Sequence, residues 1–378
     1  MSRRIRLGMV GGGEGSFIGA AHRVAARLDD GYELVAAALS SNTARAQSSG
    51  AALHLDPQRC YADYREMAKA EASRSDGIDV VAIVTPNHLH VPVARSFLEQ
   101  GIHVICDKPL GISVAEVEDL RLQVQGSGLM FMVTHTYSGY PMVRHARELV
   151  QQGAVGEVRV VQVEYAQDWL AEPLELTGQK QAAWRSNPAL AGPAGALGDI
   201  GTHAFHLAEF VTGLRAEALC AGLNTFVPGR TLDDDVQVML RFQGGARGML
   251  WASQVAIGNS NRLQLRVYGS KGGLHFDHAK QDQLVYSQLG AAEQTIYRGS
   301  LAAGSLAAAA TRLPAGHPEG YFEAFAHLYR EFAANWRQYA AGALQTTNYP
   351  GIADGCRGMA FIDSTLKSNA AGISWVVR

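Results

Sequence analysis

The sequence has little cysteine, almost no net charge and no long apolar run. Four cysteines occur in 378 residues, and they are isolated from one another: Cys60, Cys106, Cys220 and Cys356. Isolated thiols favour a protein of the reducing cytoplasm over one held by disulfides or by a structural zinc.

The near-zero balance of charge, −2 at pH 7, and the lack of a basic block exclude an electrostatic nucleic-acid surface. No apolar segment is long enough to span a bilayer, so no membrane partner is expected. The basic start, Met1 to Arg6, leads into a short apolar run ending in glycines, which predicts a first strand rather than a signal peptide. The nearest match to a metal motif, the pair His88 and His90, follows Pro86 at a loop-to-helix junction, so no metal site is predicted.

The first half alternates between apolar strands and helices, and the length of the chain favours two domains. The expected strands are 5–10, 32–39, 78–84, 102–106 and 129–134, and the expected helices are 20–28, 64–72, 90–100 and 113–124. Alternation on short connections predicts a doubly wound parallel sheet. We therefore expect a Rossmann-type, NAD(P)-binding domain over residues 1–136.

The first strand runs into a glycine-rich turn that is typical of dinucleotide binding. Glycines let the backbone approach a pyrophosphate, and the helix that follows offers free N–H groups. Gly11 and Gly13 fit the first two positions of G-x-G-x-x-G, whereas Gly19 comes three residues late, so the loop carries an insertion. A flexible turn is the alternative. The residues expected to contact the cofactor here are Gly11, Gly13, Ser16, Phe17 and Ile18.

Two further strand ends carry candidate cofactor residues. The second strand ends in Ser40-Ser41-Asn42, without the acid that usually holds the ribose diol of NAD. Ser40 and Arg45 would suit a 2′-phosphate, which favours NADP, unless Arg45 only covers a helix surface. The third strand ends in Thr85-Pro86-Asn87, a polar turn that would lie beside the nicotinamide, although a helix-capping turn explains Asn87 equally well.

Lys108 follows the apolar run 102–106 in the step Asp107-Lys108-Pro109. A lysine has no place inside a covered strand, so it must lie at the carboxyl end, where open α/β sheets bind ligands. Pro109 ends the pairing and favours an extended conformation at Lys108. The alternative is a solvated lysine at a strand end.

The second half, residues 137–378, changes to runs of strands without intervening helices. The expected strands are 158–165, 235–242, 247–255, 262–268, 273–276 and 284–286, which predicts an α+β domain with a mostly antiparallel sheet. Its open face would bind another subunit. Helices are expected at 318–338 and 351–371, with the option that they pack back on the first domain. Asp233 to Asp235 are interpreted as a solvated turn, and the alanine-rich stretch 301–310 as mobile.

A long segment, 167–198, interrupts these strands, and a loop of this length usually covers a site. It leads to Asp199 and His203, which share one face of a helix because they are four residues apart. A carboxylate and an imidazole facing one way are what proton transfer needs. The alternative is a helix-capping aspartate and a packed histidine.

These residues together resemble the Gfo/Idh/MocA family of oxidoreductases over nearly the whole chain. The motifs are the glycine turn Gly11 to Gly19, the segment Thr85-Pro86-Asn87 to His90, the step Asp107-Lys108-Pro109, and Gly198 to His203 as G-D-x-G-x-H. The resemblance implies a catalytic set of Lys108, Asp199 and His203, and it adds His90, Asp107 and Lys108 to the cofactor-binding residues. Asp107 replaces the commoner glutamate, and the lengthened glycine loop departs from the pattern.

The covering segment resembles the subgroup that acts on inositols, L-glucose and anhydrosugars such as levoglucosan. This resemblance implies hydride transfer between NAD or NADP and a ring secondary alcohol, and a homodimer or homotetramer formed through the second-domain sheet. Candidate substrate residues are Tyr137, Asp168, Lys180, Trp184 and Arg185. The alternatives are a cofactor-binding sensor without turnover, and a ketoreductase or epimerising enzyme that keeps its cofactor bound.

Overall fold

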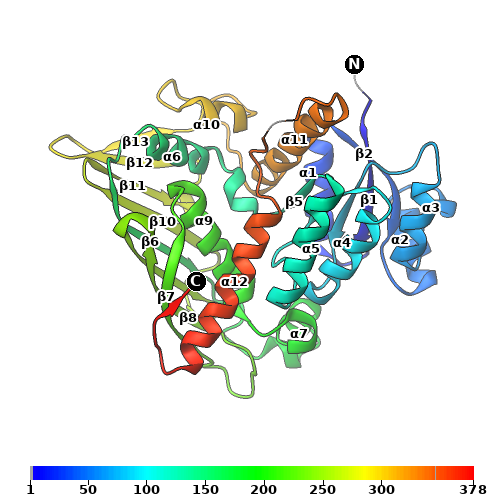
Figure 1. Ribbon diagram of the computed structural model, residues 1–378, viewed down its shortest axis with the longest axis horizontal. Helices are drawn as coiled ribbons and strands as arrows, with labels where there is room; N and C mark the ends of the chain where they lie inside the picture. Colours follow the sequence, from blue (N-terminus) through cyan, green and yellow to red (C-terminus); the bar gives the residue numbers. More distant parts are fainter. Residues whose placement is uncertain (1–2, 345) are drawn as a thin grey trace. The chain divides into compact units, whose positions relative to one another are not determined.

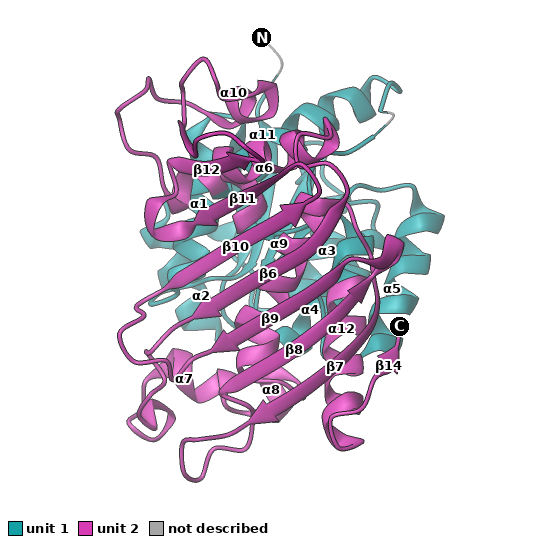
Figure 2. Cartoon of the chain, turned by 90° about the vertical axis from the view of Figure 1, so that its left-hand side faces the viewer, with its two compact units in different colours: residues 1–136, 325–356 teal, residues 137–324, 357–378 magenta. Residues whose placement is uncertain are grey.

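The computed structural model describes residues 3–344 and 346–378, and the chain divides into two compact units. Unit 1 combines residues 1–136 with 325–356, and unit 2 combines residues 137–324 with 357–378 (Figure 2). Among the described residues, no helix is both long enough and apolar enough to cross a membrane.

Unit 1 contains a five-stranded parallel sheet in the order β2-β1-β3-β4-β5 (Figure 1). The strands are β1 (Ile5–Gly11), β2 (Tyr32–Ala38), β3 (Val80–Val84), β4 (His103–Cys106) and β5 (Phe131–Val133). All residues of β3 and β4 are buried, which explains their continuous apolar sequences, since helices cover both faces of such a sheet. The predicted doubly wound parallel sheet is confirmed.

The helices of unit 1 follow the strands. They are α1 (Phe17–Leu28), α2 (Thr43–Ala52), α3 (Tyr64–Ala72), α4 (His90–Leu98) and α5 (Val114–Ser127), together with most of α11 (Tyr321–Ala340). Helix α1 begins three residues before the predicted start because the Ser16 side chain accepts a hydrogen bond from the Gly19 amide and caps it. Ser113 caps α5, as predicted, through a reciprocal capping box with Glu116.

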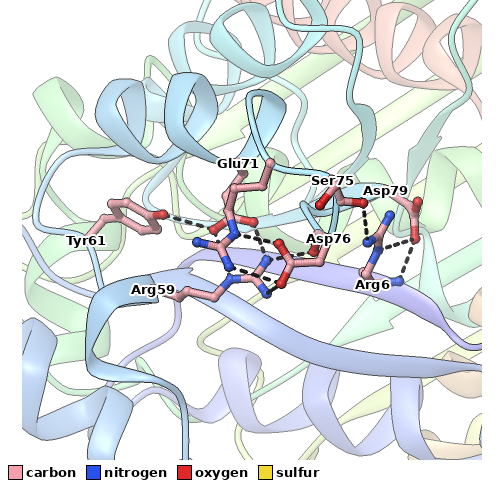
Figure 3. A network of polar contacts seen from close by, with 8 residues as sticks. Arg6, Arg59, Tyr61, Glu71, Ser75, Asp76 and Asp79 are labelled. Carbon is pink, nitrogen blue, oxygen red and sulfur yellow. Dashed lines mark hydrogen bonds and ion pairs between the residues drawn. The ribbon is translucent and has the colours of Figure 1, made fainter.

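A buried ion pair connects the segment before α3 to α3 itself in unit 1. Figure 3 shows Arg59 facing Glu71, with Nε donating to Oε1 at 3.1 Å and the Tyr61 hydroxyl donating to the same oxygen at 2.9 Å. The Arg59 and Glu71 side chains are 8% and 0% exposed. Because removal of one partner would leave the other charge buried, this pair constrains the frame of the unit.

Unit 2 contains a nine-stranded sheet in the order β13-β12-β11-β10-β6-β9-β8-β7-β14, and its strands lie side by side facing the viewer in Figure 2. All described neighbours are antiparallel except β6 and β9. The strands are β6 (Val158–Ala166), β7 (Ala216–Asn224), β8 (Asp235–Phe242), β9 (Arg247–Ser253), β10 (Arg262–Gly269), β11 (Gly272–Asp277), β12 (Gln283–Gln288), β13 (Gln294–Tyr297) and β14 (Val376–Val377). The predicted mostly antiparallel sheet is confirmed.

Helices pack on one face of this sheet, and the other face stays open (Figure 2). The helices of unit 2 are α6 (Pro141–Gln151), α7 (Lys180–Arg185), α8 (Pro188–Ala191), α9 (Thr202–Thr212), α10 (Ser305–Ala310) and most of α12 (Ile352–Ala370). Along β8, burial alternates strictly from Val236 to Phe242, which is the pattern of a strand with one covered and one open face.

One sequence interpretation for unit 2 was wrong, and a second stays a prediction. The stretch 301–310, which was expected to be mobile, includes helix α10, whose first amides, Ser305 and Leu306, donate to the Glu148 carboxylate. Asp233, Asp234 and Asp235 were expected in a solvated turn, but they are 7%, 0% and 5% exposed. Buried backbone N–H groups bind the first two of these aspartates, which makes their burial tolerable.

Candidate active site

The glycine turn after β1 brings the start of α1 close to the strand end. Gly11 and Gly12 have left-handed backbones, with φ of +79° and +75°. A Cβ atom on Gly19 would lie 2.4 Å from the Gly12 Cα, so only glycine permits this approach. Gly19 therefore provides the close helix-to-strand packing of the third fingerprint glycine, in spite of its late position.

The surroundings of this turn fit a dinucleotide. A Cβ atom on Gly13 would lie 2.8 Å from the Leu39 carbonyl oxygen, so only glycine lets the loop pack this closely against the end of β2. Phe17 and Ile18 are the first residues of the twelve-residue helix α1, whose amino end favours a pyrophosphate. The buried Thr85 hydroxyl has no hydrogen-bond partner among the residues that the structure describes, as expected for a group that awaits a ligand.

The end of β2 presents hydroxyls and no acid. The Ser40 hydroxyl accepts from the Asn42 amide at 3.2 Å, and Asn42 caps α2 by accepting from the Arg45 amide at 3.0 Å. The first turn of α2 has no acidic residue, and the Arg45 side chain is exposed. This end therefore lacks the carboxylate that would discriminate against a 2′-phosphate.

Lys108 comes two residues after the end of β4 and is partly exposed, next to a buried network around Asp107. Asp107 lies 3.2 Å from the Nε2 of His22 and accepts from the Thr134 hydroxyl, and the Nδ1 of His22 lies 2.7 Å from the Tyr329 hydroxyl. Burial opposes ionisation of Asp107, but His22 and Thr134 outweigh it and hold the pKa of this carboxyl below its ordinary value. The acid before Lys108 thus anchors the strand end.

His90 and Asn87 are buried at the end of β3. The His90 ring is fully buried, and its Nδ1 and Nε2 lie 2.7 Å from the Pro109 carbonyl oxygen and 2.9 Å from the Thr85 carbonyl oxygen. The ring therefore connects the turn after β3 to the backbone beside Lys108. Both ring nitrogens face backbone carbonyls of these two strand ends, and a contact of His90 with the cofactor stays a prediction.

In unit 2, Asp199 lies in a π-helical turn, Leu197–Gly201, that leads directly into α9 and His203. The expected single helix therefore starts with a wider turn, which often marks functional positions in helices. The Asp199 amide donates to the Gly195 carbonyl at 2.9 Å. Both Asp199 and His203 are partly exposed, whereas their neighbours Ile200 and Thr202 are buried.

The covering segment reaches Asp199 through Arg185 of α7. The Nε of Arg185 lies 3.3 Å from Oδ2 of Asp199, and the guanidinium lies over the Trp184 ring at 4.3 Å from its centroid. Gln254, just after β9, donates through Nε2 to the same Asp199 oxygen at 2.9 Å. The structure thus brings one predicted substrate residue, Arg185, to the predicted catalytic aspartate, and a second, Trp184, packs against the Arg185 guanidinium.

His203 packs against a pair of tyrosines. The Tyr137 ring meets the His203 ring edge to face with centroids 4.9 Å apart, and the Tyr165 ring lies at 6.3 Å. The two tyrosine hydroxyls are hydrogen-bonded to each other, and Tyr165 donates onward to Asn261 at 2.8 Å. Tyr137 is 5% exposed, so its contact with His203 fixes the orientation of that imidazole.

The two remaining predicted substrate residues have other surroundings. The Asp168 carboxylate accepts from the Gly258 amide at 3.0 Å, and Lys180 is exposed at the start of α7. Sequence reasoning missed His22, Tyr165 and Gln254. No local pattern marks Gln254, because its contact with Asp199 spans 55 residues and depends on the sheet.

Comparisons with known proteins support this architecture. Residues 5–135 match the model of an oxidoreductase family with an NAD-binding Rossmann fold, and residues 143–275 match the GFO/IDH/MocA C-terminal domain. A solved oxidoreductase from Sinorhizobium meliloti is 47% identical, covers 99% of this chain and 100% of its own, and superposes with a TM-score of 0.90.

Two other relatives have a more specific description. An inositol dehydrogenase homologue from Azotobacter vinelandii, solved with NADH and myo-inositol, is 35% identical over 100% of this chain and 98% of its own, with a TM-score of 0.93. A levoglucosan dehydrogenase from Pseudarthrobacter phenanthrenivorans is 30% identical over 75% of this chain and 76% of its own length.

The fold and the glycine turn define an oxidoreductase with an NAD-binding Rossmann domain. The chain belongs to the Gfo/Idh/MocA family of oxidoreductases, which confirms the resemblance found in its motifs.

Proposed function

We propose that this enzyme catalyses the reversible oxidation of a ring secondary alcohol of an inositol, sugar or anhydrosugar to the ketone, with NAD or NADP. The observation that carries the proposal is the arrangement around Asp199 and His203. One π-to-α turn presents both side chains, Arg185 and Gln254 hold the carboxylate, and Tyr137 orients the imidazole. The solved relative with NADH and myo-inositol, and the levoglucosan dehydrogenase, support this substrate class.

The proposal gives each of three side chains a separate role. His203 takes the hydroxyl proton of the substrate as general base. Asp199 accepts a hydrogen bond from the substrate and keeps the imidazole in its acting orientation. Lys108 donates to the substrate oxygen and stabilises the negative charge that develops there. Groups of this kind typically contribute about 10² to 10⁴ in rate.

The glycine turn, with Thr85 and Asn87, would hold the dinucleotide, and Ser40 and Arg45 would receive its adenosine ribose. When bound, the nicotinamide supplies the acceptor for the hydrogen that leaves the substrate carbon. The chain's own contribution is to place the alcohol and to remove its proton.

The substrate subsite is proposed to combine one apolar surface with several charged groups. Trp184 offers a ring face to sugar C–H groups, and Arg185, Lys180 and Asp168 offer partners for hydroxyls. Tyr137 borders this subsite through its contact with His203.

We propose that the enzyme is a homodimer or homotetramer joined through the open face of the nine-stranded sheet. A groove of about 800 Å³ lies on this face, and it is lined by residues that include Met239, Met249 and Trp251. Met239 and Met249 are each 50% exposed, which is unusual for methionines on a monomer surface.

The four cysteines are free thiols, which supports the proposal that the protein is cytoplasmic.

The test is to offer a panel of inositols, pyranoses and anhydrosugars with NAD⁺ and with NADP⁺, and to follow the reduced cofactor. The proposal predicts multiple turnovers with at least one cyclic polyol. Tight cofactor binding without turnover on the whole panel would contradict it and would indicate a sensor. A single turnover without cofactor release would indicate instead an epimerising cycle.

A further inference from the structure

The three aspartates that lead into β8, Asp233, Asp234 and Asp235, are buried in unit 2. A buried carboxylate is costly unless hydrogen bonds or an opposite charge stabilise it. Asp233 is 7% exposed. Its Oδ1 accepts from the Gly195 amide and its Oδ2 from the Leu197 amide, both at 2.7 Å. Its carbonyl oxygen also accepts from the Ala196 amide at 2.9 Å. One residue therefore binds three successive amides of a segment that lies about forty residues earlier in the chain.

The fit between these two segments leaves no space for a side chain. A Cβ atom on Gly195 would lie 2.1 Å from the Asp233 carbonyl oxygen. Substitution at Gly195 would therefore push the backbone at 195–197 away from Asp233. The Asp233 carbonyl binds the Ala196 amide, and the two carboxylate oxygens bind the amides of Gly195 and Leu197 on either side of it. We call these three contacts the clamp.

The clamped amides belong to the start of the turn that carries Asp199. Leu197 is the first residue of the π-helical turn, and the Asp199 amide donates back to the Gly195 carbonyl at 2.9 Å. The partner of the Asp199 side chain is anchored at the same place, because the Gln254 amide donates to the Asp234 carbonyl at 2.8 Å. The Asp233 residue and the backbone carbonyl of residue 234 thus support both Asp199 and the group that binds it, whereas the Asp234 side chain takes no part in these contacts.

We propose that Asp233 is a positioning residue for the reaction: its ionised carboxylate fixes the 195–197 amides and thereby sets where Asp199 presents its oxygens. The inference rests on the proposed function of Asp199. The charge is required because each carboxylate oxygen accepts from an N–H group, whereas protonation or an amide replaces one acceptor with a donor. Asp233 itself lies outside the group of side chains proposed to touch substrate.

Asp234 is the charged group that acts on the ionisation of Asp233. The Asp234 carboxylate accepts from the amides of Phe226 and Val227 at 2.8 and 3.0 Å and pairs with Arg230 at 3.2 Å. Burial, together with a smaller contribution from Asp234, raises the pKa of Asp233 to about 6 although two backbone N–H groups oppose the shift. The clamp is therefore expected to loosen within the range of an ordinary pH–rate profile.

The test compares Asp233→Asn with Asp234→Asn in the full-length enzyme. Both variants replace a buried carboxylate that binds two backbone amides, but only the first touches the Asp199 turn. We expect Asp233→Asn to lower kcat roughly 10- to 100-fold with little change in the dissociation constant for NAD⁺. The decrease in kcat that the wild type is expected to show below about pH 6 should be absent from the pH–rate profile of the variant. We expect Asp234→Asn to lose at least as much in Tm, because it also removes a partner of the buried Arg230, while kcat stays within about threefold.

Gly195→Ala should disrupt the same contacts from the other partner, because the added Cβ atom would push Gly195 away from Asp233. It should lower kcat by a factor similar to that of Asp233→Asn, and the double variant should be no worse than either single one, because both remove one interaction. Equal kcat losses for Asp233→Asn and Asp234→Asn, or fully additive losses in the double variant, would overturn the proposal.

Hydrogen exchange gives a readout that does not depend on turnover. Amides in the peptide 195–203 should exchange at least about tenfold faster in Asp233→Asn than in the wild type, and at the wild-type rate in Asp234→Asn. This result would stand even if the sugar panel gave no product, so failure of the clamp and failure of the proposed activity are distinguishable. Unchanged exchange in Asp233→Asn would overturn the clamp.

Discussion

Gln254 donates a hydrogen bond through Nε2 to Oδ2 of Asp199 at 2.9 Å, and Arg185 approaches the same oxygen at 3.3 Å. Gln254 is 2% exposed and follows a strand of the sheet, whereas Arg185 belongs to the covering segment. One carboxylate oxygen is therefore held by the rigid sheet and by a segment that covers the site. This relationship makes Gln254 a second support for Asp199, independent of the backbone clamp.

The first prediction concerns this hydrogen bond. Gln254→Leu should lower kcat/KM roughly 10- to 100-fold, because hydrogen bonds to charged groups are worth about 1.5 to 3 kcal/mol. Gln264→Leu is the matched control, since Gln264 is equally buried and donates to the Asp277 carboxylate at 2.8 Å. Steady-state kinetics of the two variants, with Tm as a check of folding, decides the matter. Equal losses in both would show that Gln254 acts only on stability.

The second prediction concerns the pH dependence of stability. The pKa of Asp233 is about 6 in the folded protein, against an ordinary value of 3.8, so the folded state binds this proton more tightly than the unfolded state. Because burying the ionised carboxylate costs free energy, stability is highest below about pH 4, where Asp233 is protonated, and falls by about 3 kcal/mol as the pH rises through 6. The fall occurs even though the ionised form is the one that binds the 195–197 amides.

Urea unfolding of the wild type and of Asp233→Asn at pH 4 and pH 7 measures this change. The variant does not titrate at this position, so between pH 4 and pH 7 the unfolding free energy of the wild type should fall by about 2 kcal/mol relative to that of the variant. A difference that stays constant with pH would contradict the assignment.

The third prediction separates the frame of unit 1 from the site. Glu71→Gln removes the buried partner of Arg59 and leaves it the longer ion pair with the exposed Asp76 carboxylate at 3.7 Å, so it should lower the unfolding free energy by about 3 kcal/mol. Glu118→Gln, in the solvent-screened pair with Arg121, should leave the unfolding free energy nearly unchanged. Urea titrations give both values. A loss for Glu71→Gln as small as that for Glu118→Gln would show that the buried pair constrains nothing.

The sequence predicted the parts of the site that depend on chain order. Lys108 follows an apolar run and so had to lie at a strand end, and Asp199 and His203 are close in sequence, so one helical segment had to present both. The catalytic roles themselves came from the family motifs and remain proposals. The same local reasoning failed for Asp233, because three consecutive aspartates usually face water, and the amide partners of Asp233 lie almost forty residues away in the chain.

The missed elements have similar causes. Strand β7 contains no β-branched residue and includes Gly222, so its local propensity for a strand is low, and pairing with β8 overrides it. Helix α10 takes its N-terminal cap from Glu148 of α6, more than 150 residues earlier, so nothing adjacent to it in the sequence indicates where it begins.

The fourth prediction concerns the choice of cofactor at the end of β2. Ser40→Asp places a carboxylate where the ribose 2′ position is expected, so it should accept a hydrogen bond from the NAD ribose and repel a 2′-phosphate. The ratio of kcat/KM for NAD⁺ to that for NADP⁺ should rise roughly tenfold or more relative to the wild type. Arg45→Ala should change the ratio in the same direction. A ratio unaffected by both would place the adenosine ribose elsewhere.

The central claim is that Lys108, Asp199 and His203 act together on a cyclic alcohol in the presence of a nicotinamide cofactor. The most direct test is single-turnover oxidation of the best substrate of the panel by wild type, Lys108→Met, Asp199→Asn and His203→Phe, each saturated with cofactor. The account predicts that Asp199→Asn and His203→Phe bind NAD⁺ as the wild type does, and that the rate of alcohol oxidation at saturating cofactor falls roughly 10²- to 10⁴-fold in all three variants. Variants that oxidise the alcohol at the wild-type rate would contradict it.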